Sequence, residues 1–272
     1  RAFFCVHPVG GSVLCYAELA RALGPDQPFY GLQAPGLDGE QPPLDTIEAL
    51  AEVHVAAVRA VQPRGPYLLG GWSMGGNIAL EMAQQLQRQG EHVELLVVID
   101  GYAGNPEGPL PAEDAAAMMT ALFARDLAAI SGEGPVTPDE SLAAMEPEEQ
   151  LQHLLEEGRK SAAVTPDTEL PRLRALREVF ASNLRANARY CPEPYAGPIV
   201  LLRSGDPGKD PVDQERSWKR VGRSGVEVHD LPGDHYSLLR APHVQRLAER
   251  LKEYLERAPA SQEADAKAKQ PA

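Results

Sequence analysis

The chain has 272 residues, of which 43% are hydrophobic and 24% charged, as in a globular protein large enough to bury a sizeable core. Its formal net charge of −13 argues against nucleic acid as a partner, because phosphate binding needs a basic face. Three cysteines without a C-x-x-C pair argue against a disulfide framework or zinc site and favour the cytoplasm, and no apolar run reaches the roughly 20 residues that would make a membrane span.

Strand-like and helix-like segments alternate along the first hundred residues. Apolar segments predict a buried strand at 2–6 and further strands at 28–33, 67–72 and 93–100, of which the last is a continuous apolar run. Segments with apolar residues at helical spacing predict helices at 12–23, 45–62 and 77–90. Ser12 is expected near the cap of the first helix. Asp45 and Glu48 have the spacing of a capping box for the second.

The alternation stops between residues 104 and 195 and resumes afterwards. The interrupted region contains helical patterns and no clear strand, at 111–131, 147–163 and 170–190. Beyond it we predict strands at 198–203 and 225–231 and helices at 213–222 and 241–258. The final segment, 258–272, lacks large apolar side chains and is expected to be disordered.

This order of elements predicts a mostly parallel sheet covered by helices on both faces. Residues 1–103 and 196–257 would form that core, and residues 104–195 would form an inserted helical lid, with joints at 104–111 and 132–138. The chain begins with Arg and enters a strand at once. We therefore expect a domain of a longer polypeptide, a trimmed fragment being the alternative.

The stretch GGWSMGGN, at residues 70–77, joins a predicted strand to a predicted helix through a very tight turn. Ser73 lies at its tip, and Gly71 and Gly75 stand where strand and helix would approach too closely for side chains. This pattern is typical of the nucleophile elbow of the α/β-hydrolase fold. The backbone N–H of Met74 would face a developing oxyanion. A chance match in a glycine-rich loop is the alternative, and the strand–helix context argues against it.

A serine hydroxyl needs a general base to become a good nucleophile. His235 lies in LPGDHYSLL after the last predicted strand and completes the order serine, acid, histidine, whereas His7 would only border the site. We favour Asp100 as the acid, because it ends an apolar strand where a carboxylate needs a partner. Asp206 lies in a Pro/Gly loop where it would cap a turn, and Asp234 is poorly placed to point at its neighbour.

The loop after the first predicted strand is HPVGG, at residues 7–11, and it should supply the second oxyanion donor. We expect this donor to be the backbone N–H of Val9, since the neighbouring glycines let the backbone approach a ligand closely. An ordinary glycine-rich turn is the alternative.

Five stretches together resemble the type I thioesterase domain, the terminal release domain of nonribosomal peptide synthetases and polyketide synthases. They are FFCVHPVGGSVLCYAELARAL, FYGLQAPGLDGEQPP, YLLGGWSMGGNIALEMAQQL, VVIDGY and LPGDHYSLL. The resemblance covers the core and places the acid at Asp100. It implies that Ser73 takes an acyl chain from the phosphopantetheine arm of an upstream carrier domain, with no cofactor bound by this domain. His235 would act as base and then as acid, and release would be by hydrolysis or ring closure.

Other functions fit parts of the same pattern. A stand-alone esterase or lipase, or an editing thioesterase, would use the same fold, and a hydrolase-like domain that only binds a ligand is a third alternative. The ordered serine, acid and histidine argue against the last. An acidic carrier domain would be attracted to either of two basic segments, solvated helix faces being the alternative. These segments are 174–189, with Arg174, Arg177, Arg185 and Arg189, and 216–223, with Arg216, Lys219, Arg220 and Arg223.

Overall fold

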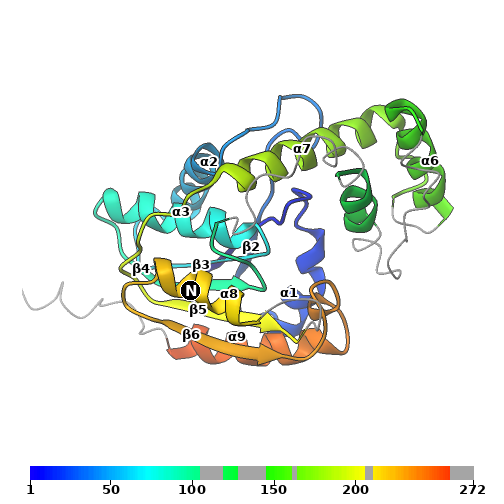
Figure 1. Ribbon diagram of the computed structural model, residues 1–272. Coiled ribbons are helices and arrows are strands. Elements are labelled where there is room, and N and C mark those ends of the chain that lie inside the picture. Colours follow the sequence, from blue (N-terminus) through cyan, green and yellow to red (C-terminus); the bar gives the residue numbers. More distant parts are fainter. Residues whose placement is uncertain (105–118, 128–144, 161–163, 206–210, 258–272) are drawn as a thin grey trace, which may run out of the picture.

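The computed structural model describes residues 1–104, 119–127, 145–160, 164–205 and 211–257, and in these residues it contains a six-stranded sheet with helices on both faces (Figure 1). The sheet order is β2-β1-β3-β4-β5-β6, and every neighbouring pair is parallel. The strands are β1 (Phe3–Val6), β2 (Phe29–Leu32), β3 (Tyr67–Trp72), β4 (Val93–Ile99), β5 (Ile199–Ser204) and β6 (Val226–Leu231). The predicted parallel sheet is therefore confirmed.

Each face of the sheet carries its own apolar core. Alternate strand residues point to opposite faces, so that Phe4 and Val6 of β1 join one core while Phe3 and Cys5 join the other. The first core is covered by α2 (Ile47–Val61), α3 (Gly75–Arg88) and α8 (Pro211–Val221). The second is covered by α1 (Ala17–Leu23) and α9 (His243–Arg257). Burial on both faces explains why the central strands β1, β3 and β4 are mostly apolar, whereas the edge strands β2 and β6 have exposed residues.

The strand order reverses at β1, and this reversal positions the candidate site. The chain passes from β1 outward to β2 and then returns to the other side of β1 as β3. Loops leaving the carboxyl ends of β1 and β3 therefore diverge and leave a crevice, where ligands bind in open parallel sheets. Val9 follows β1 and Ser73 follows β3, so both residues lie at this point.

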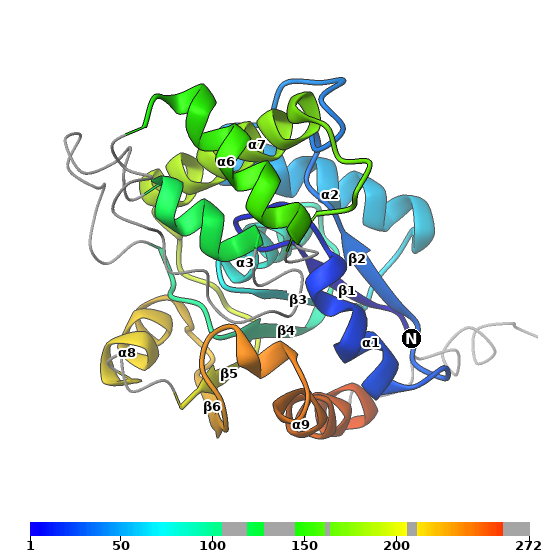
Figure 2. The same cartoon turned by 90° about the vertical axis from the view of Figure 1, so that its right-hand side faces the viewer.

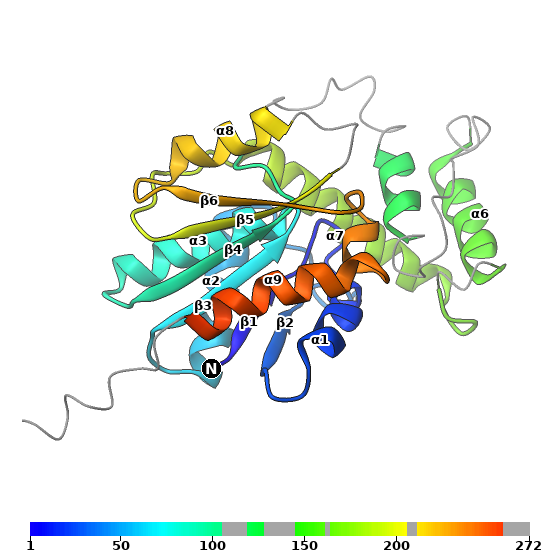
Figure 3. The same cartoon turned by 90° about the horizontal axis from the view of Figure 1, so that it is seen from below.

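The described helices between β4 and β5 form a separate layer beyond the carboxyl ends of the strands, which we call the helical insertion (Figures 2 and 3). It comprises the helical residues 119–127, α6 (Pro147–Lys160) and α7 (Leu170–Arg189). These helices share an apolar cluster that includes Phe123, Leu127, Leu151, Leu154, Leu173 and Phe180. Ala186 and Tyr190, in and just after α7, also join the core beneath α2 and α3, so α7 ties the insertion to the sheet.

Some helix boundaries differ from those predicted. The first expected helix begins as a 3-10 turn, Leu14–Tyr16, before α1. The capping box at the start of α2 was wrong: the N-cap is Thr46, whose hydroxyl accepts a hydrogen bond from the Ala49 amide at 3.2 Å. The predicted tail, 258–272, both expected joints and much of the predicted helix at 111–131 lie outside the described residues. Among the described helices, none is long and apolar enough to cross a membrane.

Candidate active site

Ser73 occupies the tight turn between β3 and α3 in a left-handed backbone conformation. Its φ is +57°, and its amide donates a hydrogen bond to the carbonyl of Ile99 on β4 at 2.8 Å. A Cβ on Gly71 would lie 2.2 Å from the backbone of Gly75, and a Cβ on Gly75 would lie 2.5 Å from the carbonyl oxygen of Val6. The predicted reason for both glycines is therefore confirmed, since backbone packs against backbone on either side of the serine.

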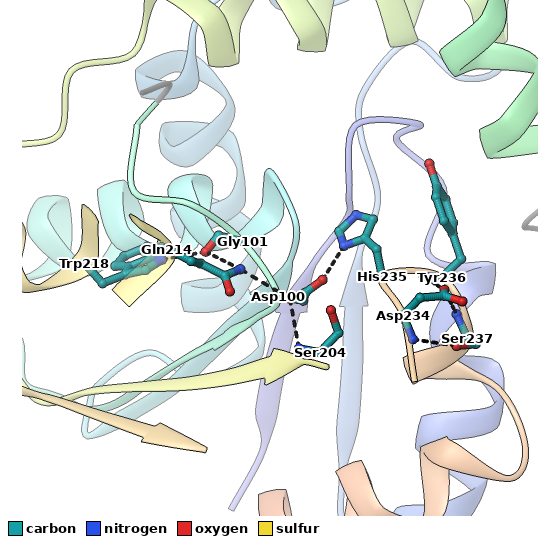
Figure 4. Close-up of polar contacts among 9 residues, drawn as sticks. All are labelled: Asp100, Gly101, Ser204, Gln214, Trp218, Asp234, His235, Tyr236 and Ser237. Carbon is teal, nitrogen blue, oxygen red and sulfur yellow. Dashed lines mark hydrogen bonds and ion pairs between the residues drawn. The ribbon is translucent and has the colours of Figure 1, made fainter. Parts of the chain in front are cut away.

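Asp100 and His235 meet at the carboxyl edge of the sheet (Figure 4). His235 Nδ1 lies 2.7 Å from Asp100 Oδ2, where the carboxylate side chain is completely buried. Asp100 follows β4, and His235 belongs to the loop after β6, so sheet pairing through β5 brings them together. With Nδ1 facing the acid, Nε2 is the ring nitrogen left for a serine proton. His235 and Ser73 line the same pocket.

The Asp100 carboxylate is held by groups from β5 and α8. Its backbone has a φ of +49°, and its Oδ1 accepts hydrogen bonds from the Ser204 amide at 2.9 Å and from Gln214 Nε2 at 3.3 Å. Gln214 also donates to the Gly101 carbonyl at 3.2 Å, which accepts a second bond from Trp218 Nε1 at 2.7 Å (Figure 4). These contacts fix Oδ1 and leave Oδ2 for the imidazole.

Sequence reasoning missed this clamp on Asp100. Gln214, Ser217 and Trp218 stand at i, i+3 and i+4, which places them on the buried face of α8. A glutamine and a serine on the buried face of a helix need hydrogen-bond partners, and that requirement was the available signal.

The other two candidate acids have different positions. Asp234 Oδ1 accepts hydrogen bonds from the amides of Tyr236 and Ser237, both at 2.9 Å, and so stabilises the loop that carries the histidine. Asp206 lies outside the described residues.

Val9 and Met74, the predicted oxyanion donors, both line the pocket at Ser73. Within the described residues, neither backbone N–H donates a hydrogen bond to another residue. The Val9 carbonyl accepts a bond from Asn183 Nδ2 of α7 at 2.9 Å, which holds the Val9–Gly10 peptide next to the Pro8–Val9 peptide that carries the donor N–H. The space beside Gly10 is filled by the Asp126 carboxyl, not left for a ligand: a Cβ on Gly10 would lie 1.9 Å from Oδ2.

The Tyr16 hydroxyl connects the two loops that carry these amides. It donates to the Val6 carbonyl at 2.5 Å and accepts from the Trp72 amide at 3.0 Å. Regular pairing of β1 with β3 ends at Val6 and Gly71, so the buried phenol continues the connection where the strands diverge. The hydroxyl thereby joins the ends of β1 and β3, from which the segments with Val9 and Met74 continue.

The pocket has a volume of about 530 Å³ and is shared by the sheet edge and the helical insertion. The sheet edge contributes Val9, Ser73, Met74 and His235, and the insertion contributes Leu122, Asp126, Phe180 and Leu184. Apolar side chains thus form much of the wall opposite the serine, as an apolar chain would require. No group of side chains in the described part of the chain could hold a metal ion.

His7, which was expected to border the site, is buried beneath it and does not line the pocket. Its ring packs edge-on against His54 at 5.2 Å, and its Nδ1 lies 2.8 Å from the Pro8 carbonyl. Burial lowers the pKa of His7 to about 4 and that of His54 to about 3. Both rings are therefore neutral at neutral pH, and His235 is the histidine that lines the described pocket together with Ser73.

A parallel sheet with a serine elbow after β3, an acid after β4 and a histidine after β6 defines the α/β-hydrolase fold. The chain belongs to the thioesterase domain family, whose model, described as "Thioesterase domain", matches residues 1–255. The resemblance read from the sequence is confirmed.

Curated relatives of this chain are much longer proteins. A dimodular nonribosomal peptide synthase of Bacillus subtilis (strain 168) is 35% identical over 237 residues, which cover 86% of this chain and 10% of the relative. Polyketide synthase PksR of the same organism is 29% identical over 273 residues, covering 89% of this chain and 10% of the relative. The chain thus spans about a tenth of either protein.

Solved structures give the same correspondence. A four-domain nonribosomal peptide synthetase bound to AMP and glycine is 33% identical, with a TM-score of 0.87 over 95% of this chain and 20% of the other. The NocB thioesterase domain, in covalent complex with a fluorophosphonate nocardicin G analogue, is 28% identical with a TM-score of 0.64. That match covers 93% of this chain and 94% of the other, so the similarity extends over a whole thioesterase domain.

Proposed function

We propose that this protein releases a finished peptide or polyketide chain from a carrier domain through an acyl ester on Ser73. His235 serves as general base and acid, and Asp100 orients it. The observation that carries the proposal is the 2.7 Å contact between His235 and Asp100 at a pocket that also contains Ser73. Two backbone amides without protein partners, those of Val9 and Met74, line the same pocket.

The first half-reaction transfers the chain to the protein. Ser73 Oγ attacks the thioester carbonyl while His235 Nε2 takes the hydroxyl proton, and the oxyanion accepts hydrogen bonds from the Val9 and Met74 amides. Collapse of this intermediate breaks the carbon–sulfur bond. The imidazolium returns its proton to the sulfur, so the carrier leaves with a free phosphopantetheine thiol and the chain remains as a Ser73 ester.

The second half-reaction frees the chain. Water, or a hydroxyl or amine of the chain itself, attacks the Ser73 ester and gives its proton to His235, which passes it to the departing serine oxygen. Water yields an acid, and an internal nucleophile yields a ring. In this proposal the helical insertion, within residues 104–195, acts as the lid that limits access of water to the ester.

The carrier domain is the proposed macromolecular partner. The two segments of this chain that are predicted to bind it are less basic than the sequence suggests. In the segment 174–189, Arg174 is paired with Glu148. In the segment 216–223, Arg216 is paired with Asp213 at 2.8 Å, and Lys219 lies 2.5 Å from a carboxylate of the preceding turn. Docking at either segment stays a prediction, since these pairs reduce the positive charge offered to a partner.

The experiment that tests the proposal combines a covalent probe with two matched substrates. A fluorophosphonate should label Ser73, as located by peptide mass spectrometry, and Ser73→Ala should abolish both labelling and turnover. Ser224→Ala, which changes an exposed serine, is the control and should behave as wild type. An acyl N-acetylcysteamine thioester should be released faster than the corresponding simple ester.

Two outcomes would contradict this assignment. Labelling at another serine would remove Ser73 from the mechanism. Faster release of the simple ester than of the thioester would favour the stand-alone esterase alternative. Mass spectrometry of the product from a long thioester then shows whether a ring or an acid is formed.

A further inference from the structure

The helical insertion places a buried carboxyl group in the wall of the catalytic pocket. Asp126 belongs to the helical segment 119–127 and is 6% exposed. It lines the same pocket as Ser73 and His235. Its Oδ2 packs directly over Gly10, as the 1.9 Å approach to a Cβ at that position requires. Because Gly10 follows Val9, the carboxyl lies close to the proposed oxyanion donor.

Asp126 has no protein partner that would account for a carboxyl in this position. Among the described residues, it makes no hydrogen bond and no ion pair. The nearby cations are engaged elsewhere: the Arg125 guanidinium lies 4.6 Å from the centre of the Tyr236 ring, and Arg240 pairs with Glu18 at 3.2 Å. Buried carboxylates are normally hydrogen-bonded or paired with a cation, so this one is incomplete by itself.

The surroundings of Asp126 favour a cation as the missing partner. Besides the two arginines, the titratable groups around it are Cys15, Tyr236 and His235, which line the pocket or the small cavity adjoining it. Burial raises the pKa of the Asp126 carboxyl to about 7, and a bound ammonium would offset the burial penalty on its charged form. An anionic or apolar ligand would leave that penalty in place.

We infer that Asp126 is a specificity-determining residue that binds an ammonium or guanidinium group carried by the acyl chain near its thioester end. The inference rests on the proposed function and narrows its substrate class to chains with a basic residue close to the reacting carbonyl. The position near the carbonyl follows from the contact between Asp126 and Gly10, beside the Val9 amide.

Matched pairs of substrates test this inference. N-acetyl-lysyl and N-acetyl-2-aminoheptanoyl thioesters of N-acetylcysteamine have side chains of equal length, with and without the ammonium. The N-acetyl-arginyl and N-acetyl-citrullyl thioesters form a second pair, in which an uncharged urea replaces the guanidinium. Thiol release without protein is measured for each thioester and subtracted. For at least one pair, wild-type protein at pH 8 should prefer the cationic member in kcat/KM by about tenfold or more, as expected for a charge-assisted contact in a buried site.

The variant Asp126→Asn keeps the shape of the side chain and removes its charge. It should abolish the preference, so that on this variant the cationic and neutral members of a pair have kcat/KM values within about twofold of each other. Glu156→Gln makes the same charge change at an exposed position of the insertion, and it should retain the preference. In wild type the preference should weaken below pH 7, where the Asp126 carboxyl holds a proton.

The inference is overturned if wild type shows no preference in either pair, or if Asp126→Asn keeps it. Failure of the proposed function would give a different result. Fluorophosphonate would still label Ser73, but neither member of a pair would be released from its thioester. Binding then decides the inference separately: calorimetry with the corresponding non-releasable amides should show tighter binding of the cationic member to wild type than to Asp126→Asn. Equal affinities would overturn the role of Asp126.

Discussion

The sheet core and the helical insertion contribute different things to one pocket. The core supplies every group proposed to act on the reacting atoms, and it presents them on loops at the carboxyl edge of a sheet whose central strands are buried. The insertion supplies the opposite wall and has an apolar cluster of its own. In our proposal the chemistry therefore depends on the topology of the sheet, and the choice of acyl chain depends on the helices of the insertion.

The largest expected effect on the rate comes from a substitution in the core, at the proposed acid Asp100. Asp100→Asn should lower kcat by about 10³- to 10⁴-fold, because the amide no longer stabilises the imidazolium formed at His235. Asp206→Asn is the matched control and should cost far less. Rates with an N-acetylcysteamine thioester measure both, and circular dichroism checks the fold. A reversal of the two effects would move the acid to position 206 and leave Ser73 and His235 in place.

The free energy of unfolding should depend on pH in opposite directions for buried groups of the core and of the insertion. The pKa of His7 is about 4 and that of His54 about 3 in the folded core, so below pH 6.5 the unfolded chain binds protons that the folded protein does not. Stability should fall by about 2 kcal/mol per histidine between pH 6.5 and 5. Urea unfolding of His54→Leu should show a shallower decline, and the exposed His92→Asn should match wild type.

Asp126 in the insertion should respond in the opposite direction. Its pKa rises to about 7 on folding, so its cost to stability develops as pH rises from about 4 to 7 and persists above. Asp126→Asn should therefore raise the free energy of unfolding at pH 8 and leave it nearly unchanged at pH 4. Equal gains at both pH values would show that the carboxyl is not penalised by burial of its charge.

The clamp on Asp100 should have an intermediate effect on rate. Gln214→Leu removes one donor to Oδ1, and kcat should fall by about 10- to 100-fold with KM nearly constant, since the carboxylate is less well oriented. The acid limb of the pH–rate profile should shift to lower pH, because a misplaced Asp100 supports the imidazolium less well. A change in stability without that shift would mean that Gln214 is only structural. Arg220→Leu, on the exposed face of α8, is the control.

The smallest effect should come from the contact that joins the two regions at the oxyanion donor. Asn183 of α7 holds the carbonyl of the Val9–Gly10 peptide, which adjoins the donor peptide at the Val9 Cα, so Asn183→Ala should loosen Val9 and lower kcat by about tenfold or less. The preference for a cationic side chain, which we propose for Asp126, should persist. If Asn183→Ala lowers both the rate and that preference, then the pocket wall formed by the insertion and the proposed oxyanion donor do not act independently.

The sequence predicted the core well because its signals are local. The elbow glycines, the continuous apolar strands and the loop after the last strand each identify their own position, and Asp100 was favoured because it ends such a strand. Gln214 and Asp126 were missed because their roles arise from packing between distant segments. Asp126 was detectable in principle: it follows Leu122 by four residues and Phe123 by three, which puts a charge inside the apolar face of a helix.

The placement of His235 after β6 bears on when the protein becomes active during its synthesis. The serine, the acid and both proposed oxyanion amides precede the helical insertion, whereas the histidine follows the last strand added to the sheet. A ribosome delivers these parts in order, and domains fold as units. A nascent chain that ends before β6 has an elbow without a base. If His235 is the base, as proposed, the Ser73 hydroxyl becomes reactive only after the helical insertion has been synthesised.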